Sequence, residues 1–226
     1  MATRPVFVPD TDPDQPQLVH VHEIDFQWLP GRSQEQKKEN IAKLHAAAKS
    51  HNLSPLLEVS ADSDHSLGYQ VCDANLAVED DRSYLVPLMA AYHGSKVFNG
   101  GGPFTDLYLK HGDDITGDER LKTSGNQIGF RFMGLEWGKR SETLFYDWLT
   151  IHAINRYRKL STGIPHFNGF TEIDCPSGGE KVCHARSCAY YVALVAKNLL
   201  DEVLDDQDRF LEIMILDSFY QPRVEK

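Results

Sequence analysis

The stretch Pro87-Leu-Met-Ala-Ala-Tyr-His-Gly-Ser-Lys-Val-Phe98, followed directly by Asn99-Gly-Gly-Gly-Pro103, decides the fold around it. Proline suits the first turn of a helix, because its missing N–H has no intrahelical partner there. Three successive glycines and a proline cannot continue a helix. The sequence therefore predicts a helix that begins at Pro87, runs through Phe98 and ends at the glycines.

Helical spacing places Met89, His93 and Lys96 on one stripe of this helix. A run of glycines lets bare N–H groups approach a ligand, and such a nest binds anions. A partly desolvated lysine beside it can act as a neutral nucleophile towards a sugar or carbonyl carbon. The alternative is an exposed lysine near a helix C-terminus, whose dipole favours the charged amine. Spacing alone leaves both readings open.

Upstream of this stretch, the pattern indicates strands and one helix. Residues 1–17 are rich in proline and aspartate and predict an irregular segment, whereas 18–28 alternates like a strand, with a change of phase that indicates a bulge. Ser33 and Gln36 form a capping-box pattern before a helix over 34–51. Short runs at 56–60 and 68–78 predict strands or extended segments.

Downstream, helices dominate. We expect a short helix over 118–124, a long one that Ser141 caps and that runs to Lys159, and another over 186–204 that follows the Gly178-Gly179 turn. Residues 205–226 are expected to form a C-terminal extension of the domain. The sequence predicts one α+β domain over residues 1–226, mainly helical with several short strands.

The composition excludes several classes of protein. The formal net charge of −10 makes a strong general attraction to nucleic acid unfavourable, although 131–159 contains a local basic excess. The N-terminus shows no signal-peptide pattern and no apolar run could span a membrane, so a cytoplasmic location is expected. Four cysteines, at 72, 175, 183 and 188, are interpreted as thiols; their spacing predicts no metal site, and no cofactor motif is present.

Several motifs in a fixed order point to a known family. The run from Ala91 to Tyr108 (AYHGSKVFNGGGPFTDLY) resembles the NADAR family, and more closely the branch associated with DarT-type toxins. The segments FQWLPG (26–31), LKTSGNQIGFRF (121–132), FYDWL (145–149) and ARS (185–187) are similar to the same branch. The resemblance extends from about Pro5 to Leu204.

This resemblance implies an enzyme that removes ADP-ribose from guanine bases of DNA or RNA, as the antitoxin to a DarT-type ADP-ribosyltransferase. Lys96 matches the family lysine, which implies attack of its amine on the anomeric carbon of the distal ribose through a Schiff base. Splitting one difficult displacement into two easier steps is the physical advantage of such an intermediate.

The remaining site residues follow from the same resemblance. Asp106, Asp174 and Asp147 are candidates for proton transfer or for holding ribose hydroxyls. Ligand binding is assigned to the glycine run, to an arginine at a helix start, to a histidine on the stripe of Lys96 and to a tryptophan that could equally belong to the core: Asn99, Gly100, Gly101, Gly102, Arg186, His93 and Trp137.

Two positions depart from the family pattern. Met89 stands where the family commonly has a carboxylate, and a thioether cannot transfer protons. His93 stands where glutamine is frequent and could partly compensate as a titratable group. Two alternatives therefore remain: a weak or inactive domain that binds ADP-ribose or sequesters the toxin, and an N-glycosidase that acts on a ribosylated small metabolite.

Overall fold

The computed structural model describes residues 1–177 and 182–220. Its strands are β1 (Ala2–Pro9), β2 (Val19–Phe26), β3 (Leu56–Glu58), β4 (Ala77–Glu79), β5 (Leu85–Pro87), β6 (Lys96–Phe98), β7 (Gln127–Phe132), β8 (Leu135–Gly138) and β9 (Gly169–Thr171). Its α-helices are α1 (Gln34–Ser50), α2 (Ser66–Gln70), α3 (Leu88–Gly94), α4 (Asp113–Thr116), α5 (Arg120–Thr123), α6 (Glu142–Arg156), α7 (Arg158–Gly163), α8 (His184–Ala196), α9 (Leu200–Asp205) and α10 (Gln207–Tyr220). The 3₁₀ turns are η1 (Thr105–Leu109), η2 (Lys139–Ser141) and η3 (Ile164–His166). This arrangement confirms the predicted α+β class.

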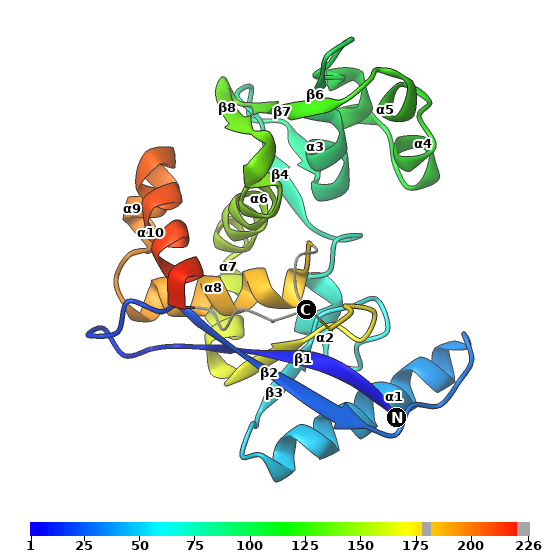
Figure 1. The fold of residues 1–226 in the computed structure, drawn as a ribbon, viewed down its shortest axis with the longest axis vertical. Coiled ribbons are helices and arrows are strands. Elements are labelled where there is room, and N and C mark those ends of the chain that lie inside the picture. Colours follow the sequence, from blue (N-terminus) through cyan, green and yellow to red (C-terminus); the bar gives the residue numbers. More distant parts are fainter. Residues whose placement is uncertain (178–181, 221–226) are drawn as a thin grey trace.

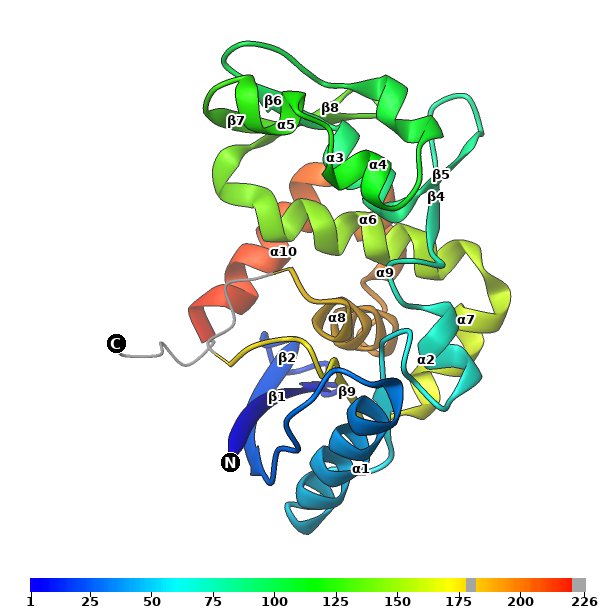
Figure 2. The ribbon, with the colours of Figure 1, turned by 90° about the vertical axis from the view of Figure 1, so that its right-hand side faces the viewer.

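The elements are stacked in layers (Figures 1 and 2). A four-stranded sheet in the order β2-β1-β9-β3 has α1 against one face and α8 against the other. Helix α6 packs against both α8 and α3, and the three-stranded ribbon β6-β7-β8 lies beyond it. The long helix α6 therefore separates the sheet layer from the layer that contains Lys96.

Residues 1–17 were expected to be irregular, but the structure contains a strand there. Residues 2–9 form strand β1 and pair with β2 along their whole length, rather than remaining irregular. Strand β9 pairs with β1 at only one position, Phe7 opposite Phe170. The prolines at 5 and 9 are tolerated because much of β1 has no second neighbour that requires an N–H donor.

The prediction of a bulge in β2 is also wrong. The register of β1 and β2 is continuous from Ala2 opposite Phe26 to Pro9 opposite Val19. Val19 and Val21 belong to the core beside α8, whereas Ile24 and Phe26 pack with α1. The change of phase in the sequence arises because the two ends of one regular strand are covered on opposite faces.

Helix α3 ends earlier than predicted. A Cβ atom at Gly94 would lie 2.6 Å from the ring of Tyr108, so the chain makes a close contact there and then leaves the helix. Lys96 is the first residue of β6 and pairs with Phe130 of β7. The catalytic candidate is therefore on a strand, two residues after the end of the helix that the sequence predicted to contain it.

The other helices follow the prediction with breaks. The capping box of Ser33 and Gln36 is present at α1, and α5 occupies part of 118–124. The helix expected to reach Lys159 stops at Arg156, and Ser141 makes no side-chain cap. The helix expected over 186–204 is split into α8 and α9, because Asn198 adopts a left-handed conformation, with φ of 57°. Residues 66–70 form α2 rather than an extended segment.

The C-terminal extension is part of the domain core. Helix α10 contributes the buried side chains of Phe210, Ile213 and Met214 to the main core. All four cysteines are buried and free. The Gly178-Gly179 turn and residues 221–226 lie outside the described residues.

Candidate active site

The amine of Lys96 lies on an aromatic surface. Its Nζ atom is 4.6 Å from the centroid of the Tyr92 ring, and the residue is half-buried. Burial lowers the pKa of Lys96 below its usual range, and the charge of Glu142 acts in the opposite direction. A larger fraction of this amine is therefore neutral near pH 7 than for a lysine in water.

Tyr92 is fixed by the core. Its ring is 5.6 Å from that of Phe130, 6.4 Å from Phe145 and 5.3 Å from Tyr146, measured between centroids. The Tyr92 hydroxyl donates a hydrogen bond of 2.5 Å to Oε1 of Glu142. Burial and this carboxylate raise the pKa of Tyr92 well above its usual range, so its hydroxyl remains a donor.

Glu142 is the residue of this site that the sequence analysis missed. It is the first residue of α6, it bonds to Tyr92, and its charge acts on both Lys96 and His93. In the sequence, Glu142 is one acidic residue within the basic segment 131–159. Its position at a helix start, three residues before the FYDWL motif, was the available signal.

His93 is close to the same group. Its ring lies edge-on to Tyr92 at 5.0 Å, and its Nδ1 atom is buried with no hydrogen-bond partner among the described residues. Burial, assisted by the charge of Lys96, lowers the pKa of His93 to about 4. The imidazole is therefore neutral at pH 7 and does not repel the amine.

Asp147 and Arg186 form a buried ion pair. Arg186 donates to Oδ2 of Asp147 at 2.9 Å, and the Ser187 hydroxyl donates to Oδ1 at 2.6 Å. Burial raises the pKa of Asp147, and the charge of Arg186 acts against this shift. The pair links α6 to the first turn of α8, so both Asp147 oxygens are already bonded and the guanidinium is held in one orientation.

Asp106 and Asp174 are paired with cations other than Lys96. Asp106 is exposed and accepts two hydrogen bonds from Arg120, which holds its pKa below the usual range. Asp174 is exposed and is bonded to Lys37 at 2.7 Å. Among the described carboxylates, Glu142 is the one whose charge alters the pKa of Lys96.

The glycine run does not present the expected anion nest. The N–H groups of Asn99, Gly100 and Gly101 donate to the carbonyl oxygens of Asn126, Ser124 and Phe98 at 3.0, 2.9 and 3.3 Å. Gly102 has a φ of +88°, and a Cβ atom there would lie 2.3 Å from the carbonyl oxygen of Lys96. The glycines allow close packing against β6, and in this conformation three of the four N–H groups are not available to a diphosphate.

Trp137 belongs to the core. It is 3% exposed and packs against Phe145, Trp148 and Phe210, with ring centroids 5.3 to 6.0 Å apart. The ring therefore cannot stack on a base without opening the core, which removes it from the ligand-binding set. Met89 is partly buried and also packs against this core.

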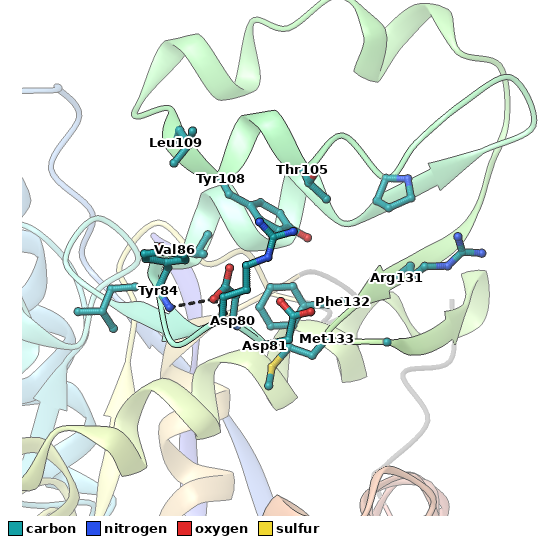
Figure 3. A pocket seen from close by; sticks show the side chains of 14 residues that line it. Asp80, Asp81, Tyr84, Val86, Thr105, Tyr108, Leu109, Arg131, Phe132 and Met133 are labelled. Atoms are coloured by element: carbon teal, nitrogen blue, oxygen red, sulfur yellow. Dashed lines mark hydrogen bonds between the residues drawn. The ribbon is translucent and has the colours of Figure 1, made fainter.

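A hollow of about 460 Å³ lies near the segment that precedes Lys96 (Figure 3). Tyr108, Phe132, Asp81 and Arg131 are among the residues that line it. The Tyr108 hydroxyl hydrogen-bonds to that of Ser95, the residue before Lys96. Lys96 itself does not line this hollow, so the two features are neighbours rather than one site.

The comparison with protein families decides the relationship that the motifs suggested. A family model described as DarT1-associated NADAR antitoxin matches residues 2–223. The chain belongs to this family. The match includes the sheet layer as well as the β6 ribbon, and it supports an antitoxin role associated with a DarT toxin. Comparison of this NADAR chain with curated proteins returns no match.

The described part of this NADAR chain was also searched for metal sites and for membrane-spanning helices. Residues 1–177 and 182–220 contain no group of three or more histidine, cysteine or acidic side chains placed to hold a metal ion. Within the same ranges, every helix is too short or too polar to cross a lipid bilayer.

Proposed function

We propose that this NADAR protein is an N-glycosidase that removes ADP-ribose from guanine bases of DNA or RNA, with Lys96 as the nucleophile. The observation that supports the proposal is the placement of the Lys96 amine on the ring of Tyr92, where burial lowers its pKa. An amine must be neutral to attack carbon, and desolvation is one way in which proteins make it so.

The proposed reaction has two stages. The Nζ lone pair forms a bond to C1 of the distal ribose while the bond from C1 to the guanine nitrogen breaks, and its electron pair leaves with the base, which takes up a proton. Loss of a proton from Nζ and opening of the ribose ring then give an imine. Water adds to this imine, and the C–N bond breaks to release ADP-ribose and the free amine.

The antitoxin role follows from this chemistry. Hydrolysis of the adduct restores the unmodified guanine and so reverses the damage made by a DarT-type ADP-ribosyltransferase. The net charge of −10 suits recognition of the ADP-ribosyl group more than of the phosphate backbone. A base in a single strand would reach the site without the cost of unpairing.

Release of ADP-ribose from a guanine-ADP-ribosylated oligonucleotide tests the proposal. Lys96→Ala and Lys96→Arg should each lower turnover by about 10³-fold or more, because neither side chain supplies a nucleophilic amine. Borohydride should trap ADP-ribose on the wild-type protein and on neither variant. Turnover unaffected by both substitutions would refute Lys96 as nucleophile.

The same assay distinguishes the alternatives. A protein that binds ADP-ribose without turnover would be the non-catalytic domain that Met89 suggests. Cleavage of ribosylated nucleotides or metabolites, but not of the oligonucleotide, would indicate a small-molecule glycosidase.

A further inference from the structure

We propose that Glu142 is the carboxylate that transfers protons in the reaction of Lys96, and that Tyr92 holds it in position. This inference rests on the proposed glycosidase function and assigns a catalytic residue to it. In α3, Met89 occupies the position at which the family resemblance implies a carboxylate. Lys96 nevertheless has an acidic neighbour, Glu142, which belongs to α6.

Tyr92 connects the amine and the carboxylate. The face of its ring supports Nζ of Lys96 at 4.6 Å, while its hydroxyl donates to Oε1 of Glu142 at 2.5 Å. The ring is packed among Phe130, Phe145 and Tyr146, so the hydroxyl has little freedom to move. Both functional groups are therefore positioned by one rigid aromatic side chain.

The other candidate carboxylates have different partners. Asp106 and Asp174 are exposed and bonded to Arg120 and Lys37, and Asp147 is bonded to Arg186 and Ser187. In Glu142, Oε1 accepts from Tyr92, and a carboxylate has a second oxygen that can carry a proton. The groups around it are Tyr92 and His93 from α3 and Lys96 from β6.

The proton transfers balance. The carboxylate first removes a proton from the Lys96 ammonium through one bridging water molecule, since the two described side chains make no direct ion pair, and this leaves a neutral amine and a carboxylic acid. As Nζ bonds to C1, Glu142 gives that proton to the departing guanine nitrogen and becomes a carboxylate again. It then takes a proton from the alkylated nitrogen and passes it to the ribose ring oxygen as the ring opens to the imine.

Glu142→Gln tests the assignment, because the amide keeps the shape and can still accept from Tyr92. We expect kcat for the ADP-ribosylated oligonucleotide to fall by about 10²- to 10⁴-fold. Borohydride trapping of free ADP-ribose, whose open-chain aldehyde needs no leaving base, should persist. Its pH profile should move to lower pH, because removing the charge of Glu142 lowers the pKa of Lys96 further.

Tyr92→Phe provides a second variant with the ring retained. It should reduce kcat by about ten- to a hundredfold, through loss of one hydrogen bond to a charged group. Tyr191→Phe is the matched control, since that buried hydroxyl bonds to Asn155, and Glu136→Gln controls for loss of an exposed carboxylate.

If the wild-type protein shows turnover and trapping, and Glu142→Gln has an unchanged kcat, the role of Glu142 in proton transfer is refuted. The proposed glycosidase function is then not affected. A trapping profile that does not move would also count against this role of Glu142, because a merely structural glutamate would not affect the amine. Absence of turnover in the wild-type protein would overturn the function and this inference together.

Discussion

Several titratable side chains of this protein are buried, and burial shifts their pKa values so that the neutral form is favoured. His152 lies against Trp148 with ring centroids 4.0 Å apart, and burial lowers its pKa to about 4. Burial lowers the pKa of His45 and His184 to about 4 as well, as it does for His93. In contrast, burial raises the pKa of Glu58 to about 7, so this group favours folding at lower pH.

The buried imidazole of His152 should make the fold less stable in acid. A histidine with a folded pKa near 4 and an unfolded pKa near 6.5 binds its proton more readily when unfolded, so stability is lost as pH falls through this window. His152→Gln should therefore reduce the slope of unfolding free energy against pH by up to about 1.4 kcal/mol per unit between the two values. Urea denaturation at several pH values measures this slope. Equal slopes in the two proteins would contradict the prediction.

At the scale of elements, the position of Lys96 depends on how β6 is packed. The glycine turn after β6 returns so closely that Gly102 abuts the Lys96 carbonyl oxygen, and the Tyr108 ring fills the space beside Gly94. The sequence correctly indicated a helix and a glycine turn after it, and the role of Lys96 remains a prediction. It could not indicate where the helix stops, because Tyr108, which causes the close contact at Gly94, is distant along the chain.

An element-scale prediction follows from this packing. Gly102→Ala should destabilise the fold by about 1–3 kcal/mol, since the new Cβ overlaps backbone and the φ of +88° is unfavourable for alanine. Borohydride trapping on Lys96 should fall too, because β6 must shift. Gly138→Ala is the control: a Cβ there meets nothing within 4 Å, so thermal stability should be almost unchanged. Similar melting temperatures for the two variants would refute the packing argument.

The whole molecule brings together residues that no local pattern relates. The capping box of α1 and the combination of helices with short strands were predictable, because hydrophobic periodicity and capping are local signals. The pairing of Glu142 with Tyr92 joins residues 50 positions apart and was not predictable. The same holds for β1, where prolines hide a strand that is recognisable only beside β2.

A prediction at the scale of the molecule concerns salt. With a net charge of −10, binding should depend on the ADP-ribosyl adduct, so the affinity of the Lys96→Ala variant for a modified oligonucleotide should change little between about 50 and 200 mM salt. Fluorescence anisotropy measures this affinity, with unmodified oligonucleotide as the control. A decrease of about a thousandfold over that range would instead indicate many phosphate contacts.

The ring of Tyr92 touches the amine on its face and the carboxylate through its hydroxyl. A substitution among the aromatic side chains that enclose it would therefore move both reactive groups at once, without touching either. The relative placement of the amine and the carboxylate is consequently a property of the hydrophobic interior, so a change in side-chain volume there would alter the geometry of both groups together.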